Sequence, residues 1–149
     1  METKIAMFRS VRKEDYPNGP IVDGKVVDGI LYPSFEETPI TSGPRKGEMR
    51  LPDARIDKTK DGIFVLPGGG TSLFDKQDVF GSKYWVCFKI PVGTTYDDSL
   101  KLVGPEENKR YNADHYQIEP RTRMRIDAYK GALDNFARNA LAREFEQSR

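Results

Sequence analysis

The stretch GGGTSLFD, residues Gly68–Asp75, decides how the rest of this chain is organised. Three successive glycines lose more backbone entropy on folding than other residues, so this stretch predicts a positive φ or a very close backbone approach. The apolar run Ile63–Leu66 ends at Pro67 and predicts a buried strand that leaves a sheet. A glycine loop followed by the hydroxyls of Thr71 and Ser72 is typical of a site for a small polar ligand, because free N–H groups can face a phosphate or an amide. The alternative is an ordinary turn.

The composition of the chain excludes several classes of function. At 149 residues we expect one domain, residues 1–149. With 24 basic and 23 acidic side chains, the net charge of +1 predicts no bulk attraction to nucleic acid or to an anionic membrane. No apolar segment is long enough to span a membrane, and no cleavable signal peptide is recognisable.

The cysteine and histidine content makes a metal centre unexpected. Cys87 is the single cysteine, which excludes an intramolecular disulfide and favours folding in a reducing compartment. Its apolar neighbours predict a buried, inert thiol. There is no zinc-type Cys/His spacing, no P-loop and no dinucleotide-binding GxGxxG motif, so we expect no metal.

An early strand is predicted over Lys4–Arg12, with Arg9 as a lone cation in an otherwise apolar row. Burying a guanidinium without a partner is costly, so Arg9 is expected to meet a carboxylate or an anionic ligand. An edge strand with Arg9 reaching water is the alternative. The following segment, Glu14–Asp61, is interrupted by six prolines and predicts a small hairpin or docked loops, either functional or mobile.

The second half of the chain predicts further strands. Tyr84–Ile90 is apolar on both faces and is therefore expected to be central in the sheet. Leu100–Val103 predicts a short strand, and the polar run Gly104–Asn112 predicts an exposed loop.

A late strand is predicted over Asp114–Pro120. Alternation places His115, Gln117 and Glu119 on one face, and Tyr116 on the other. This face combines an imidazole, an amide and a carboxylate, although the histidine could equally be a satisfied core or surface residue and the carboxylate part of a surface ion pair.

The C-terminal segment Asp127–Gln147 predicts an amphipathic helix with Asp127 as its N-cap. Its apolar residues recur at steps of three and four, which is typical of a helix packed on a sheet or a partner. These residues are Ile126, Tyr129, Leu133, Phe136, Ala137, Ala140, Leu141 and Phe145.

Taken in order, the chemistry-bearing segments are Phe8–Arg9, Thr71–Ser72 and His115–Glu119. This order resembles the ADP-ribosyltransferase fold. The runs GGGTSLFD, YWVCFKIPVGT and DHYQIEP, with the helix around Leu133–Ala140, look like the small NAD-dependent toxins delivered by type VI secretion systems. The resemblance runs from Met7 onward and is weakest over Glu14–Asp61. It implies an α+β fold, with mixed or antiparallel sheets around an NAD cleft and a C-terminal amphipathic helix.

The resemblance assigns NAD-binding roles to Arg9 of the early strand and to three residues of the glycine stretch. Arg9 would hold the pyrophosphate as a bidentate cation. Gly70 would contribute to NAD binding, and Thr71 and Ser72 would brace the floor of the nicotinamide pocket by hydrogen bonds. Ser72 is also a candidate catalytic residue. The Ser-Thr-Ser element of the fold is reduced here to Thr71–Ser72.

The resemblance also assigns roles on the late strand. His115, a catalytic candidate, and Tyr116 would line the cleft, with the Tyr116 ring available for nicotinamide stacking. Glu119, at the Gln-x-Glu position, would stabilise the oxocarbenium-like ribose or activate the incoming nucleophile. The small toxins lack an acid at this position, so the catalytic base stays unassigned.

The function implied is that of a cytotoxic effector with NAD-dependent ADP-ribosyltransferase activity. NAD would serve as substrate and no metal would be needed. The alternatives are an NAD glycohydrolase toxin and a non-enzymatic toxin that retains the fold and acts by binding. The expected partners are a cognate immunity protein, secretion-apparatus proteins and an unknown macromolecular target. The protein would be made in the cytoplasm, secreted without a cleavable signal peptide, and active in the cytoplasm of the target cell.

Overall fold

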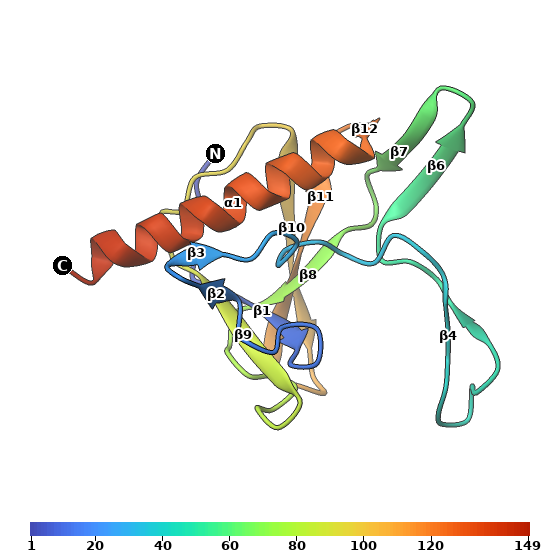
Figure 1. Cartoon of the computed structure of the whole chain (residues 1–149), viewed down its shortest axis with the longest axis horizontal. Helices are drawn as coiled ribbons and strands as arrows, with labels where there is room; N and C mark the ends of the chain where they lie inside the picture. Colours follow the sequence, from blue (N-terminus) through green and yellow to red (C-terminus); the bar gives the residue numbers. More distant parts are fainter.

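The computed structural model describes every residue from Met1 to Arg149. Its central element is a five-stranded sheet in the spatial order β10-β11-β8-β1-β9, with all neighbours antiparallel (Figure 1). A single helix, α1 (Ile126–Gln147), crosses one face of this sheet. The strands are β1 (Met7–Arg12), β8 (Thr71–Phe74), β9 (Trp85–Ile90), β10 (Leu100–Asn108) and β11 (Ala113–Pro120). The predicted α+β class is confirmed.

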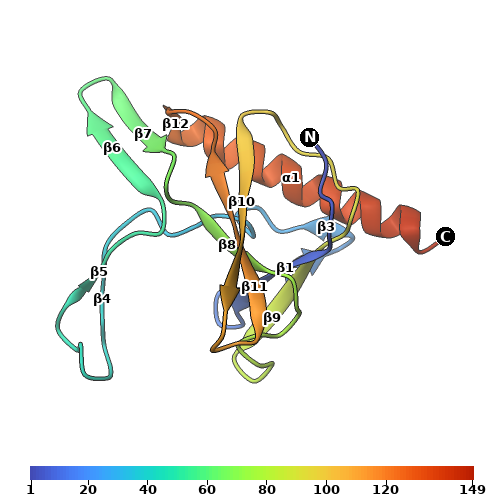
Figure 2. The same cartoon turned by 180° about the vertical axis from the view of Figure 1, so that it is seen from behind.

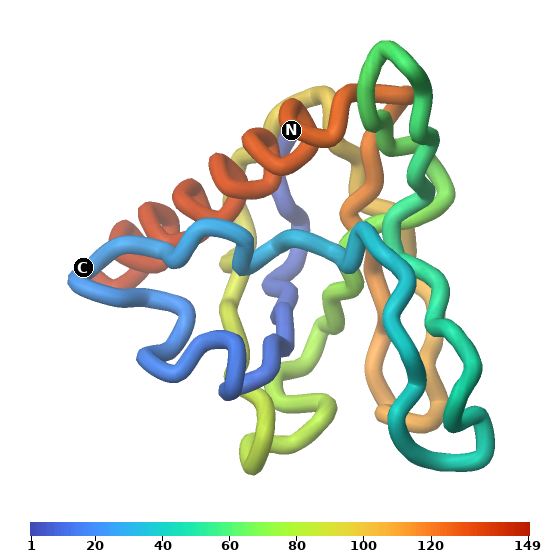
Figure 3. The backbone as a smooth tube through the Cα atoms, turned by 45° about the vertical axis from the view of Figure 1, so that its right-hand side comes forward, coloured from blue at the N-terminus to red at the C-terminus, as the bar shows by residue number.

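Three smaller sheets surround the central one. Strand β12 (Met124–Arg125) pairs with β7 (Gly62–Leu66), which pairs with β6 (Arg55–Thr59). Two short hairpins complete the set. In Figure 1 the arms formed by β4–β5 and β6–β7 extend away from the main sheet, and Figure 3 shows them, in teal and green, along one side of the molecule. The hairpin strands are β2 (Ile21–Val22), β3 (Lys25–Val26), β4 (Thr38–Pro39) and β5 (Met49–Arg50). The Pro-rich region therefore contains hairpins and one strand, β6, that was not expected there.

The hydrophobic core lies between α1 and the sheet. Helix residues Tyr129, Leu133 and Phe136 are fully buried, as their three- and four-residue spacing predicts. They pack with Leu73 of the central strand β8 and Ile118 of its neighbour β11. Seen from behind, the opposite face of the sheet carries no helix (Figure 2).

Strand β9 occupies an edge of the sheet, so the prediction of a central position for Tyr84–Ile90 is wrong. Its two faces are apolar because they are covered by different elements. Ile90 is buried in the core below α1, whereas the Trp85 ring lies 4.9 Å from the Phe80 ring of the preceding connector. Cys87 is half-buried rather than buried, and its Sγ accepts the Asp78 N–H at 3.3 Å. A covering loop thus produced the same two-sided apolar pattern as a neighbouring strand.

Two further boundaries differ from the sequence prediction. Strand β10 continues through the polar run to Asn108, because it pairs with β11 as a ribbon beyond the core, where exposed side chains are polar. A register shift between Val103 and Glu106 marks a bulge in that ribbon. Helix α1 begins one residue early, with Arg125 at its N-cap and no side-chain cap, so Asp127 lies in the first turn. An acidic side chain in the first turn still stabilises the helix, because it interacts favourably with the positive end of the helix dipole.

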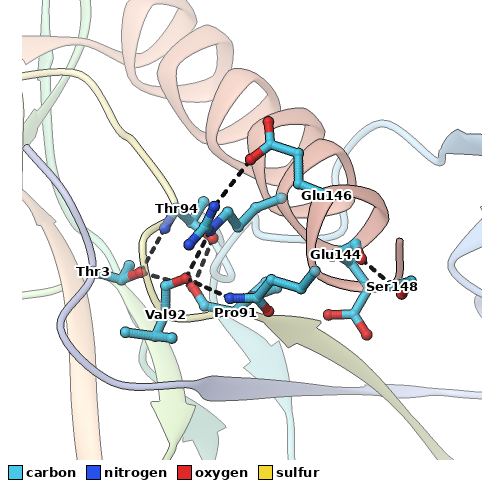
Figure 4. Close-up of polar contacts among 9 residues, drawn as sticks. Thr3, Pro91, Val92, Thr94, Glu144, Glu146 and Ser148 are labelled. Atoms are coloured by element: carbon cyan, nitrogen blue, oxygen red, sulfur yellow. Dashed lines mark hydrogen bonds and ion pairs between the residues drawn. The ribbon is translucent and has the colours of Figure 1, made fainter.

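The connection between β9 and β10 is tied to both ends of the chain (Figure 4). The buried Thr3 hydroxyl donates to the Pro91 carbonyl at 2.8 Å and accepts the Thr94 N–H at 2.9 Å. From the last turns of α1, Arg143 and Gln147 donate to the Val92 carbonyl at 3.1 and 3.2 Å. These bonds hold the β9 edge against the helix.

Candidate active site

The glycine loop before β8 is a point of close backbone approach, as its sequence predicts. Gly68 has a φ of +100°, a conformation that other residues rarely adopt. A Cβ on Gly69 would lie 2.5 Å from the Asp53 carbonyl oxygen, and one on Gly70 would lie 1.9 Å from the Ile118 carbonyl oxygen. The loop therefore passes between β11 and the Asp53 backbone with no room for side chains.

The N–H groups of this loop are used inside the protein. Gly70 donates its N–H to the Asp53 carbonyl at 2.9 Å, and Gly68 donates its N–H to the Glu119 carboxylate at 2.7 Å. The Glu119 side chain is buried, and its other oxygen accepts the Gln117 side-chain amide at 2.8 Å. The expectation that these two N–H groups are free for a ligand is therefore wrong. In this structure, Glu119 holds the loop in place.

Thr71 and Ser72 point to opposite faces of β8. Thr71 is completely buried on the core side, where its hydroxyl donates to the Leu31 carbonyl at 2.5 Å. Ser72 lies on the face opposite the core and lines a cleft that also contains Arg9. The threonine thus anchors a loop, whereas the serine is the member of the pair at the cleft wall.

Arg9 lies where β1 and β8 diverge. The two strands are paired at Phe8 and Phe74, and Arg9 follows directly. Its Nη1 donates to the Ser72 carbonyl at 3.2 Å and its Nη2 donates to the Tyr32 carbonyl at 2.9 Å, but its buried Nε has no partner. Burial lowers the pKa of Arg9, although the Asp53 carboxylate acts in the opposite direction.

The guanidinium of Arg9 forms no salt bridge, so the first partner that its sequence context predicts, a carboxylate, is absent. Two backbone carbonyls orient the group but do not neutralise it. An anionic ligand would supply the charge that the protein does not.

The cleft that contains Arg9 and Ser72 has a volume of about 800 Å³. Arg12 and Arg50 also line it, together with Asp15, Asp28 and Asp53. This volume falls in the range of small-molecule sites in proteins.

One side of the cleft is an aromatic wall made of Phe74, Phe80, Trp85 and Tyr111. The Phe80 ring is central, with centroids 5.7 Å from Phe74, 4.9 Å from Trp85 and 5.0 Å from Tyr111. The guanidinium of Arg12 lies 5.2 Å from the centre of the Trp85 ring. Sequence analysis missed this wall, because its residues come from separate segments that no linear spacing connects.

The late-strand candidates lie outside the cleft. His115 shares the Ser72 face of the sheet, and its ring lies 5.3 Å from the ring of Phe74, which lines the cleft. His115 itself lines a smaller hollow beside Glu106. Tyr116 pairs with Leu73 and packs against the core on the other face. The structure thus brings Arg9 and Ser72 together in the cleft, places His115 behind Phe74, and leaves Tyr116 and Glu119 apart from them.

No group of three or more His, Cys, Asp or Glu residues in the structure is placed to hold a metal ion. Its one helix lacks the apolar length needed to cross a membrane.

Comparison with known proteins defines the class of this fold and cleft. Residues 3–145 match the family described as Tse2 ADP-ribosyltransferase toxin, so the protein is a toxin and an enzyme of the ADP-ribosyltransferase class. The chain is 34% identical over 157 aligned positions to "Toxin Tse2" of Pseudomonas aeruginosa, which covers 99% of this chain and 95% of that protein. It belongs to the Tse2 ADP-ribosyltransferase toxin family. The resemblance inferred from the sequence motifs is confirmed.

Proposed function

We propose that residues 1–149 act as one toxin domain that cleaves the nicotinamide–ribose bond of NAD and transfers ADP-ribose to a macromolecule. In this reaction, nicotinamide leaves with the electron pair of the broken bond, and a nucleophile on the acceptor forms the new bond at the same ribose carbon and loses a proton. The observation that carries the proposal is the buried, partnerless Nε of Arg9 at the cleft between β1 and β8.

The chemistry of the cleft fits a dinucleotide. A guanidinium has five N–H donors, and Arg9 gives two of them to backbone carbonyls, so three donors and the positive charge have no partner within the protein. The aromatic wall offers flat apolar surface for a planar ring, and Ser72 also lines the cleft. Arg9 is therefore proposed as the pyrophosphate ligand and Ser72 as the residue nearest the chemistry.

His115 remains a catalytic candidate because Phe74 connects it to the cleft. Tyr116 and Gly70 have no surface on the cleft, so their proposed contribution is to hold β8 and β11 in register. Glu119 is assigned the same kind of contribution through its bond to Gly68.

Growth of a bacterial host that expresses the chain tests this assignment. Wild type is compared with Ser72→Ala and His115→Ala, with cellular NAD measured in parallel and Ser82→Ala, an exposed serine, as the matched control. We expect wild type and the control to kill, and the two site variants, still folded, to be harmless. Site variants that kill like wild type would refute the placement of the site.

The NAD measurement separates transfer from hydrolysis. Toxicity with the NAD pool intact supports modification of a scarce target. A collapse of the NAD pool with no macromolecule labelled by a tagged NAD analogue would support the glycohydrolase instead. Toxicity with neither labelling nor NAD loss would support a toxin that acts by binding alone.

We further propose that a cognate immunity protein silences the toxin by docking over or near this cleft. A cell that makes such an enzyme in its own cytoplasm, before secretion to a target cell, has to block it. Affinity purification of Ser72→Ala toxin from the native host should recover a small partner in equal amount. Recovery of none, or of a partner that leaves the cleft accessible to NAD, would contradict this proposal.

A further inference from the structure

A short loop beneath the cleft, Gly29–Tyr32, connects helix α1 to two residues of the candidate site. Gly29, Ile30 and Tyr32 line the cleft, and the side chains of Ile30 and Leu31 are buried in the core. The loop lies outside the main sheet and forms no strand pairing, so its position depends on the packing of Ile30 and Leu31 in the core and on a few specific hydrogen bonds.

On the side toward the site, the loop offers two carbonyl groups. The Leu31 carbonyl accepts the Thr71 hydroxyl at 2.5 Å, and the Tyr32 carbonyl accepts Arg9 Nη2 at 2.9 Å. Thr71 precedes Ser72 directly, and Arg9 is the unneutralised cation of the cleft. A shift of the loop would therefore move both the cation and the start of β8.

On the other side, one carboxylate of α1 holds both ends of the loop. Asp134 Oδ1 accepts the Gly29 N–H at 2.9 Å, and Oδ2 accepts the Tyr32 hydroxyl at 2.6 Å. Burial and this hydrogen bond both raise the pKa of Tyr32, so its hydroxyl stays a donor at neutral pH. A carboxylate that accepts two bonds at the ends of one short loop fixes its position and its orientation.

The neighbouring helix positions reinforce this contact. Lys130 and Arg138 lie one turn before and one turn after Asp134, on the same helix face. Lys130 Nζ lies 5.7 Å from the centre of the Tyr32 ring, and Arg138 Nη1 lies 3.9 Å from the Asp28 carboxylate. These two contacts are long or exposed and therefore weak, which leaves Asp134 as the strong bond between helix and loop.

We propose that Asp134 is a positioning residue for the ADP-ribosyl transfer reaction: through the Gly29–Tyr32 loop, it sets the place of Arg9 and of Thr71. This inference rests on the proposed binding of NAD at Arg9. The sequence of α1 indicated only a packing role, and this proposal adds a role in the activity.

The test compares the full-length wild type with Asp134→Ala, Asp134→Asn and, as matched control, Asp127→Ala. The control removes an exposed carboxylate from the same helix and carries its own small cost in stability. Each variant is assayed for NAD turnover, melting temperature and hydrogen exchange of the peptide that covers residues 27–33.

Asp134→Ala is expected to raise the KM for NAD about tenfold and to change kcat less. A tenfold effect is what the loss of one hydrogen bond to a charged group typically causes. Exchange in residues 27–33 should accelerate while the core strands stay protected. Asp134→Asn should recover part of the KM, because an amide still accepts from Gly29 and can donate to the Tyr32 oxygen. Asp127→Ala should leave KM and loop exchange unchanged.

Two results would overturn the proposal. The first is an unchanged KM in Asp134→Ala, whatever happens to its melting temperature. The second is equal loop exchange in Asp134→Ala and wild type. If the wild-type protein turns over no NAD, the proposed function itself fails, and loop exchange alone then decides whether Asp134 holds the loop.

Discussion

Substituting Gly70 by alanine tests whether the glycine loop exists for close packing. The added Cβ would lie 1.9 Å from the Ile118 carbonyl oxygen and 2.9 Å from the Tyr129 hydroxyl oxygen. Carbon and oxygen do not approach below about 3 Å, so β8 and β11 would have to separate by about 1 Å. The Tyr129 hydroxyl donates to the same carbonyl at 2.8 Å, so this bond would also be strained.

The expected cost follows from these two effects. Overpacking a close contact costs about 1–3 kcal/mol, and weakening a buried hydrogen bond adds roughly 1 kcal/mol. We therefore expect Gly70→Ala to lower the free energy of unfolding by about 3 kcal/mol. At 149 residues this corresponds to a fall of roughly 10 °C in melting temperature.

Gly131→Ala is the matched control, because it makes the same chemical change within α1. Gly131 is exposed, and a Cβ there would meet nothing within 4 Å. Alanine in a helix interior is favoured over glycine by about 1 kcal/mol, so this variant should gain stability. Urea and thermal unfolding measure both variants. A Gly70→Ala protein as stable as wild type would refute the close-approach reasoning, since the control shows that Gly→Ala alone does not destabilise.

Three further predictions concern binding, the N-terminal tie and alkaline pH. Arg9→Lys keeps the charge but loses the planar fork, so NAD affinity measured by calorimetry should fall about tenfold or more, and undiminished affinity would remove Arg9 from the site. Thr3→Val leaves the Thr94 N–H without its acceptor in a buried position, so chemical unfolding should show a loss of about 1–3 kcal/mol, and a neutral result would contradict the importance of this bond. Burial raises the pKa of Tyr129 above its ordinary value of 10. Below pH 10 the Tyr129 hydroxyl keeps its proton in both the folded and the unfolded protein. Above pH 10 the unfolded chain loses this proton first, so the free energy of unfolding should fall with rising pH, and it should fall less steeply in Tyr129→Phe. Equal slopes in the two proteins would exclude Tyr129 as a contributor.

Local patterns in the sequence predicted the element types and several contacts. The helix followed from the three- and four-residue spacing of residues such as Leu133 and Phe136, which requires no knowledge of what lies opposite them. The close approach at Gly70 followed from the entropy that a glycine run costs. The unusual position of Arg9 followed from one charge in an apolar strand. Each of these inferences depends on residues that are near neighbours in the chain.

Positions across the sheet could not be predicted in this way. Tyr84–Ile90 has the pattern of a central strand, but it lies at the edge, because a connector covers its outer face. His115 and Glu119 share a face of β11, as alternation predicts, but whether that face reaches the cleft depends on Phe74 and Gly68 from other segments.

The sequence by itself determined the family, the α+β class and the candidate residues Arg9 and Ser72, because short motifs and local periodicity carry that information. Only the tertiary structure decided what surrounds them. The site depends on segments that are far apart in the chain: β1 and β8 on either side of Arg9, the four rings of the aromatic wall, and Asp134 and Gly29, which are 105 residues apart. Such contacts arise from the packing of whole elements against one another, and no spacing along the chain encodes them.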